Sequence, residues 1–481
     1  YGMFLTLFIG ITGAEAQKDQ KQSPVYRLPD DLQTLVGDPS LLRKPEGLEV
    51  AAYVFPNYHA SALHNKLYSP GWTEYNLIRS ARPWFEGHQQ PRTPLLGELD
   101  ESLPSTWEVY NKLCKNSGID VLIWDWYWYD GKPCLHEALE EGFLEAKNTN
   151  DVKFACMWTN HPWYILYPTK QTDGSNAYPP SFDAPDFSYE EAFRSLSYIV
   201  TRYFNQPNYW KIDGKPVICI WDARRLEQKL GLEGVQKLFT ELRGLADSIK
   251  PEFALVGETL HGDYNRWMND HACHSVTNYE CYKGLYSSFN TGNMHEISYS
   301  LNRQFGSEQW CLYTGKHLLS FVDNHDVTRI ATILTDKGCL RPIYGLLFGM
   351  PGVPSVYYGS EWGMEGDKRN GDPTLRPAVE KPEENDLTAW IAALAHAHTG
   401  SKALCRGSYR NVLVQPKQLI FERYADGERV LVAINADGNP FDAHFDAGCG
   451  RAVDLITGAD HDFGGGSTLE PYSCHFWKCE R

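Results

Sequence analysis

The sequence IDVLIWDW at residues 119–126 is apolar almost without interruption. A strand with one face in water alternates apolar and polar residues, whereas a strand buried on both faces is apolar along its whole length. The stretch therefore predicts a strand of a parallel sheet that is covered by helices on both sides.

Seven further runs of the same kind punctuate the chain at regular intervals, with amphipathic stretches such as AFRSLSYIVTRYF between them. They are LEVAAYVF (48–55), VKFACMW (152–158), KPVICIW (215–221), EFALVG (252–257), HSVTNY (274–279), HLLSFV (317–322) and VPSVYY (353–358). Eight buried strands joined by helical crossovers predict an α/β fold, a (β/α)8 TIM barrel over residues 48–398. In such a barrel the catalytic side chains follow the carboxyl ends of the strands.

After residue 398 the pattern changes. NVLVQPKQLIFERYADGERVLVAINADG (411–438) consists of short strands separated by the turn sequences QPK, ADGE and ADGN. Residues 399–481 are therefore expected to form a small antiparallel β-sandwich as a C-terminal domain.

The first residues, YGMFLTLFIGITGAEAQ, form a short apolar run that ends in Ala14-Glu15-Ala16. This pattern predicts a signal peptide over residues 1–16, followed by a polar leader segment over residues 17–47. Secretion or a periplasmic location follows from this interpretation, with a cytoplasmic location as the alternative. No other stretch has the roughly 18 apolar residues that a membrane span needs.

The overall composition limits the classes of ligand and partner that the protein is expected to bind. A formal net charge of -16 disfavours a phosphate-binding surface, so nucleic acid is not expected as a partner. The 15 Trp, 28 Tyr and 21 Phe residues supply flat apolar surfaces that suit sugar rings, although most aromatic side chains simply pack cores. The 12 Cys residues contain no C-x-x-C pair, and we expect neither a cofactor nor a required metal. The oligomeric state is left open.

Acidic residues stand where predicted strands end. Asp222 follows the fourth strand, Glu258 the fifth, and His325-Asp326 the seventh. Hydrolysis of a glycosidic bond needs an acid that protonates the leaving oxygen and a second carboxylate that attacks or activates water. These residues are thus candidate catalytic groups. For Asp222 the alternatives are a helix cap or an ion pair with the neighbouring arginines.

Further polar and aromatic residues at strand ends are candidates for contacts with sugar. Asn160 and His161 follow the third strand, and the second strand carries Asp125 and Trp126 within WDWYWYDG. Packing in an aromatic-rich wall is the alternative role for these side chains.

From about Leu245 onward the chain resembles glycoside hydrolase family 13, the α-amylase family. The stretches that carry the resemblance are ALVGETLHGDYNRW, FVDNHDVTRI and GMPGVPSVYYGSEWGMEGD. The resemblance implies that Glu258 is the acid/base and that Asp326 stabilises the transition state. It also implies substrate contacts from His325, and Arg329 and Tyr358 lie in the same stretches and are candidates for such contacts.

Residues 48–240 instead resemble WbsX-like proteins related to glycoside hydrolase family 99, through AAYVFPNYH, GWTEYN, ARPWFEGHQQP, WDWYWYDGKPCL and WKIDGKPVICIW. The Arg-x-Asp motif of family 13 is missing at the fourth strand, which reads Ile220-Trp221-Asp222. The chain thus resembles two half-barrels, residues 48–240 and 245–398, joined in between by nature or by sequence assembly. Asp222 is the candidate nucleophile from the first half.

The leading functional hypothesis is a retaining glycoside hydrolase of α-amylase or α-glucosidase type that acts on α-linked oligo- or polysaccharides. One alternative is a catalytically inactive glycan-binding barrel. Another is a WbsX-like enzyme that processes surface polysaccharide.

Overall fold

The computed structural model describes residues 49–83, 85–161, 188–212, 214–248, 273–379 and 385–480, together with the strand backbones of residues 169–170, 176–177 and 254–257. The predicted signal peptide (1–16) and leader segment (17–47) lie outside the described residues, as does Glu258. The described part forms two compact units that divide between Val256 and Gly257.

The first unit is built on a parallel sheet. Its strands follow the order β1 (Ala51–Val54), β2 (Val121–Tyr129), β4 (Lys153–Trp158), β8 (Lys215–Ile220) and β9 (Ala254–Gly257). The pairs β1–β2, β2–β4 and β4–β8 are all parallel. β2 is extended by an antiparallel hairpin to β3 (Lys132–Cys134), and β8 pairs with β7 (Lys211–Ile212). All five strands of the main order coincide with runs predicted from the sequence.

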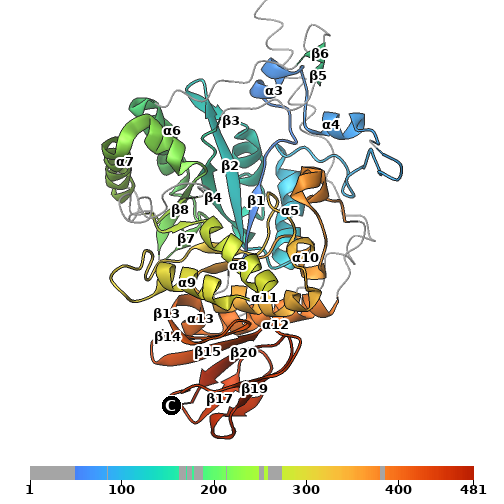
Figure 1. Ribbon diagram of the computed structural model, residues 1–481. Coiled ribbons are helices and arrows are strands. Elements are labelled where there is room, and N and C mark those ends of the chain that lie inside the picture. The colour runs from blue at the N-terminus through green and yellow to red at the C-terminus, as the bar shows by residue number, and fades with distance from the viewer. Residues whose placement is uncertain are drawn as a thin grey trace, which may run out of the picture. The chain divides into compact units, whose positions relative to one another are not determined.

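The apolar runs are buried because helices cover the sheet. Trp124 of β2 packs 4.7 Å from Trp107, which lies on α5 (Pro104–Asn116). Trp126 packs against Tyr198, which lies on α6 (Tyr189–Tyr203). Figure 1 shows α6 beside α7 (Ala223–Asp247), the helix that follows β8. The shorter elements of this unit are α3 (Ala62–Leu67), α4 (Tyr75–Ser80), η2 (Ala138–Phe143) and η3 (Thr149–Asp151).

The second unit begins with short parallel strands and their helices. β11 (Leu319–Phe321) pairs in parallel with β12 (Val353–Ser355), and Thr277, next to β10 (Ser275–Val276), bridges in parallel to Leu319. The helices are α8 (Tyr279–Thr291), α9 (Met294–Phe305), α10 (Ile330–Ile333), α11 (Leu340–Gly349), α12 (Asp386–Thr399) and α13 (Lys402–Arg406), with 3-10 turns at residues 337–339, 360–362, 368–370 and 372–374.

An antiparallel sheet follows within the same unit. Its order is β13 (Ser408–Val414), β14 (Gln418–Ala425), β15 (Glu428–Asn435), β20 (Cys474–Cys479), β17 (Arg451–Asp454) and β18 (Asp460–Asp462), and β16 (Phe441–Ala443) pairs with β19 (Ser467–Leu469). Helix α11 lies against this sheet (Figure 1) because Gly345 and Gly349 carry no side chain on the contact face. A Cβ at Gly349 would lie 2.6 Å from Val432 Cγ1.

The predicted α/β architecture with an antiparallel β-rich C-terminal region is confirmed. Closure of eight strands into one barrel stays a prediction, and so do the boundaries 48–398 and 399–481, because the division between the two units falls inside the predicted barrel. All twelve cysteines are free thiols. In the part of the chain that the structure describes, no helix combines the length and apolar character of a membrane span.

Candidate functional site

The loop after β11 is held by a buried carboxylate. Asp323 accepts hydrogen bonds from the backbone N–H of Ile330 at 2.8 Å and from the Ser360 hydroxyl at 2.8 Å. Burial raises the pKa of the Asp323 carboxyl. Because both oxygens are used and only 2% of the residue is exposed, Asp323 shapes the loop and does not face a ligand.

Arg329, a predicted substrate-binding residue, belongs to the same scaffold. Its guanidinium is fully buried and donates to the Tyr358 carbonyl at 2.5 Å and to the Leu375 carbonyl at 2.7 Å. It also lies over the Tyr357 ring, at 4.1 Å from the ring centroid. The substrate-binding role predicted for Arg329 stays a prediction, and the structure shows the side chain in the interior, where it joins the segments at Tyr358 and Leu375.

His325 and Asp326, by contrast, are exposed at the end of β11. His325 Nε2 lies 3.3 Å from Asp326 Oδ2, and the two side chains are 56% and 37% exposed. Arg376 donates to Asp326 Oδ1 at 3.1 Å and to the His325 carbonyl at 3.2 Å. Arg376 was missed by the sequence reasoning, since it lies 50 residues beyond Asp326 in an irregular segment.

The charges around His325 oppose one another. Burial lowers the pKa of His325, and the cations Arg376 and Lys368 lower it further, while Asp326 and Asp372 act in the other direction. The result is a pKa below the ordinary value of histidine. His325 is thus a neutral imidazole at neutral pH and can both donate and accept a hydrogen bond.

Two tyrosines at the end of β12 complete this cluster. Tyr358 is 41% exposed, donates its hydroxyl to the Pro377 carbonyl at 2.8 Å and packs edge-on against Tyr357. Tyr357 lies 6.3 Å from the His325 ring. The predicted residues His325, Asp326 and Tyr358 are therefore brought together on one surface of the second unit, with Arg376 and Tyr357 added.

In the first unit, Asn160 is a backbone clamp. Its side chain donates to the Asp222 carbonyl at 2.8 Å and accepts from the Asp222 N–H at 2.8 Å, and it is fully buried. The amide thus ties the end of β4 to the end of β8. The predicted contact between Asn160 and sugar stays a prediction, and in this structure both polar ends of the amide hold the backbone that positions Asp222.

Asp222 itself caps α7. Its carboxylate accepts the Arg225 backbone N–H at 2.8 Å, which is the helix-cap role weighed as an alternative. The residue is half-buried. One carboxylate oxygen has lone pairs left after this single bond, so the cap does not remove its chemistry.

The remaining residues predicted to contact sugar lie on or directly after β2 and β4. On β2, their exposure depends on the face of the sheet on which each side chain lies. Trp126 is 2% exposed, donates to the Tyr203 hydroxyl at 3.3 Å and stacks on Trp128, which is the packing role weighed as the alternative to sugar contact. Asp125, on the opposite face of β2, is half-buried. His161 is also half-buried, with its ring edge-on to Trp221 at 4.7 Å. Asp125 and His161 stay candidates.

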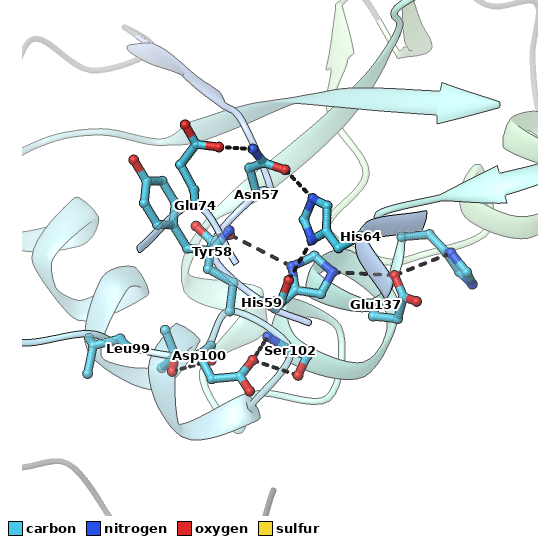
Figure 2. A network of polar contacts seen from close by, with 12 residues as sticks. Asn57, Tyr58, His59, His64, Glu74, Leu99, Asp100, Ser102 and Glu137 are labelled. Atoms are coloured by element: carbon cyan, nitrogen blue, oxygen red, sulfur yellow. Dashed lines mark hydrogen bonds and ion pairs between the residues drawn. The ribbon is translucent and has the colours of Figure 1, made fainter. Parts of the chain in front are cut away.

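A polar network after β1 was not predicted (Figure 2). His59 is fully buried, with Nε2 at 3.3 Å from Glu137 Oε2 and Nδ1 at 4.0 Å from Glu101 Oε2. Burial lowers the pKa of His59, but its side-chain contacts with Glu101 and Glu137 and the charges of these carboxylates outweigh burial and raise the pKa to about 9. His59 is therefore an imidazolium.

The pKa of Glu137, whose carboxylate faces His59, is shifted in the opposite direction. Burial raises the pKa of Glu137, but the hydrogen bond from His59 and the charges of His136 and His59 lower it to about 2. The network continues from His64 through Asn57 to Glu74 (Figure 2). The signal in the sequence was the histidine-bearing stretch NYHASALH directly after the first strand.

These residues form two candidate clusters, one in each unit. We call the first-unit set Asn57, His59, His64, Glu74, Glu101 and Glu137 the strand-end network, and the second-unit set His325, Asp326, Tyr357, Tyr358 and Arg376 the exposed cluster. The expected acid/base Glu258 lies outside the described residues, and Asp222 and Asp326 belong to different units. Their predicted catalytic roles stay predictions. Among the described residues, no three His, Cys, Asp or Glu side chains are grouped so as to hold a metal ion.

Comparison with known proteins matches residues 50–310 to the family described as Glycosyltransferase WbsX. The uncharacterized protein WxcX of Xanthomonas campestris pv. campestris is 25% identical over 182 residues, which is 37% of this chain and 24% of that protein. The WbsX match extends past residue 240 and so overlaps the part that resembles the α-amylase family.

Other relatives are α-amylase-type proteins. Neopullulanase 2 of Thermoactinomyces vulgaris is 27% identical over 237 residues, 46% of this chain and 39% of that protein. The solved structure of an Anoxybacillus α-amylase superposes with a TM-score of 0.58 at 14% identity, covering 90% of this chain and 98% of that one, and so shows a shared fold. Both resemblances expected from the sequence are confirmed. The chain spans about a quarter of the WxcX protein and about two fifths of neopullulanase 2.

Proposed function

Because the chain belongs to the WbsX glycosyltransferase family, we propose that it is a carbohydrate-active enzyme that acts on the glycosidic bonds of an oligo- or polysaccharide. The similarity to neopullulanase and to α-amylase supports α-linked glucans as the substrate class. In this proposal the enzyme is a retaining glycoside hydrolase, with Glu258 as acid/base, Asp326 as stabiliser of the transition state and Asp222 as nucleophile.

One observation carries the proposal. His325 and Asp326 are exposed at the carboxyl end of a parallel strand, where α/β enzymes hold their reacting groups. The other charged residues of the same loop, Asp323 and Arg329, are buried and serve only to hold it. An exposed acid on a rigid loop can approach positive charge that develops at a sugar ring.

The direct test is turnover of maltooligosaccharides and of α-mannan, with the products separated by chromatography. We expect glucose-type products from maltooligosaccharides, and their loss in Glu258→Gln and in Asp326→Asn. Glu308→Gln, which alters an exposed acid of the same unit, is the matched control and should keep full turnover. Oligosaccharide binding without any product would instead establish an inactive glycan-binding protein.

A second candidate function follows from the extent of the family match. Residues 50–310 include all of the described first unit except Glu49, so processing of a surface polysaccharide by glycosyl transfer or hydrolysis is the alternative. Release of mannose-type products from α-mannan, with no action on maltooligosaccharides, would select it. Secretion or a periplasmic location, with a cytoplasmic one as the alternative, stays part of the proposal, as does a single closed barrel.

The role of Asp222 can be separated from its cap. Asp222→Asn keeps an N-cap acceptor and should leave the melting temperature unchanged, whereas Asp222→Ala should cost about 1 kcal/mol of unfolding free energy. If Asp222 is the nucleophile, both variants lose turnover. Full turnover in Asp222→Asn would reduce the residue to a helix cap.

A further inference from the structure

The strand-end network contains a continuous chain of side-chain contacts (Figure 2). His64 Nδ1 lies 3.0 Å from the His59 carbonyl oxygen, and His64 Nε2 lies 2.7 Å from Asn57 Oδ1. The Asn57 amide in turn contacts a carboxyl oxygen of Glu74. All these contacts lie in or beside the loop that leaves β1.

The direction of these hydrogen bonds follows from the buried contact between His64 and the His59 carbonyl. A backbone carbonyl only accepts, so His64 Nδ1 must carry the hydrogen. Burial and the charge of the neighbouring His59 lower the pKa of His64 to about 4, so the ring is neutral and Nε2 holds a lone pair. Nε2 therefore accepts, and Asn57 must donate its NH2 to it.

Because the Asn57 NH2 must face His64, the orientation of the whole Asn57 side-chain amide is determined. A half turn of the Asn57 side chain exchanges its oxygen and nitrogen without moving any contact. Once the NH2 faces His64, the carbonyl oxygen faces the Glu74 carboxyl. Two acceptor oxygens in contact repel each other unless one of them carries a hydrogen, and only Glu74 can supply it.

We propose that this chain holds Glu74 as an uncharged carboxylic acid, and that the strand-end network binds an uncharged, hydroxyl-rich ligand and not a cation. Burial, the dominant influence on Glu74, raises the pKa of its carboxyl and acts in the same sense. Among the described residues, Tyr58 is a titratable group on which Glu74 acts, and burial and the nearby carboxylates raise the pKa of Tyr58 to about 12, so it stays neutral.

The lone pairs available in the network decide the class of ligand. A metal ion needs deprotonated ligands, but His59 is an imidazolium and both nitrogens of His64 are engaged. With Glu74 neutral, Glu137 is left as the partly exposed carboxylate, at 18% exposure. Glu101, the second carboxylate that faces His59, is only 8% exposed, and Glu137 is already paired with the imidazolium. Neither is an unpaired carboxylate for a cation, whereas a ligand hydroxyl group can donate a hydrogen bond to Glu137.

A second observation points to a missing partner. Among the residues that the structure describes, no acceptor lies within hydrogen-bond distance of His59 Nδ1, and its ion-pair partner Glu101 Oε2 is 4.0 Å away. Buried donors are almost always satisfied. This fully buried side chain therefore marks a place for an acceptor oxygen that protein atoms do not supply.

The charge state of Glu74 is tested by Glu74→Gln, with Glu86→Gln as the control at an exposed acid of the same unit. Gln donates its NH2 to Asn57 as the neutral acid does, so the melting temperature at neutral pH should change by no more than about 2 °C. If the hydrogen bonds had the opposite direction, with Glu74 ionised and His64 protonated, Glu74→Gln would leave the buried charge of His64 without a counter-ion. The melting temperature would then fall by about 10 °C, which overturns the proposal.

The pH dependence of the melting temperature distinguishes a Glu74 that is stabilised as the neutral acid from one that is stabilised as the anion. A carboxyl whose pKa is raised in the folded state loses stability as the pH rises above its unfolded value. The melting temperature of Glu74→Gln minus that of the parent should therefore increase with pH above the ordinary range of glutamate. A difference that decreases with pH would show that Glu74 is stabilised as the anion.

The ligand class is tested on the full chain by NMR of the His59 and His64 rings, titrated separately with maltotriose, with mannobiose and with Ca²⁺. We expect saturable shifts with a sugar and none with Ca²⁺. Shifts with Ca²⁺ alone, or with none of the probes, would overturn the ligand assignment. The choice of sugars rests on the proposed function, but no turnover is measured, so an inactive enzyme and an empty network give different results.

Discussion

The histidine–carboxylate pair of the first unit and that of the second have the same separation and opposite electrostatics. His59 Nε2 lies 3.3 Å from Glu137, and His325 Nε2 lies 3.3 Å from Asp326. Yet His59 is fully buried with a pKa raised to about 9, while His325 is largely exposed with a lowered pKa.

The difference comes from the other charges around each imidazole. Among the described residues, the groups that raise the pKa of His59 are two carboxylates, Glu101 and Glu137, and they favour the charged form although the side chain is buried. Burial lowers the pKa of His325, and Arg376 and Lys368 offset the attraction of Asp326 and Asp372. The same pair therefore acts as a fixed ion pair in the strand-end network and as a neutral hydrogen-bonding group in the exposed cluster.

The largest effect is expected from breaking the buried pair. Glu137→Gln leaves the His59 imidazolium with only Glu101, and we expect a loss of about 3 kcal/mol in the free energy of unfolding, measured with urea at pH 5.5. Glu145→Gln, at an exposed acid just after η2, should change nothing.

The pH profile of this loss identifies its source. His59 contributes stability below its ordinary pKa of 6.5 that disappears as the pH rises through about 9. Glu137 contributes stability above its ordinary 4.5 that disappears as the pH falls through about 2. The difference between parent and variant should therefore be flat from pH 4.5 to 6.5. A difference that vanished within that window would contradict the ion pair.

A smaller effect is expected from the scaffold under the exposed cluster. Arg329→Lys keeps the charge, but one ammonium group cannot reach the Tyr358 and Leu375 carbonyls together. We expect a loss of about 2 kcal/mol in the free energy of unfolding. Arg369→Lys, at an 88% exposed arginine nearby, is the control.

The same variant separates scaffold from substrate contact. If Arg329 only holds the loop, KM for maltooligosaccharides should stay unchanged at temperatures where the protein is folded. A raised KM with unchanged stability would restore the substrate-binding role that the burial of Arg329 argues against.

The smallest effect should come from Arg376. Arg376→Gln removes a cation that lowers the pKa of His325, so this pKa should rise, as followed by NMR of the imidazole ring. Because the Arg376–Asp326 pair is exposed, the free energy of unfolding should change by less than about 1 kcal/mol. Lys402→Gln, at an exposed lysine elsewhere in the unit, is the control, and an unmoved His325 pKa would contradict the account.

Much of the fold could be predicted because burial on both faces leaves a pattern in the sequence. The apolar runs at 119–126, 152–158 and 215–221 became β2, β4 and β8, and the turn-punctuated tail became the antiparallel sheet. The same rule located polar residues at strand ends and thus found His325, Asp326 and Asp222.

The roles of individual polar residues could not be predicted in the same way. Asn160 and Arg329 stand at strand ends like the candidates that are exposed, yet one clamps a backbone and the other is fully buried. Trp126 and Asp125 are neighbours on β2 but face opposite sides of the sheet. Which neighbour is exposed depends on contacts with residues far away in the chain.

The α/β architecture, the β-rich tail and the two family resemblances can be inferred from the sequence alone, because periodicity and motifs are local properties of the chain. Which acids and histidines are charged depends on the folded structure. The pKa of His59 depends on Glu101 and Glu137, which lie 42 and 78 residues away along the chain and are brought to it by folding. Charge states are set by burial and by the sum of nearby charges, and neither exists before the chain has folded.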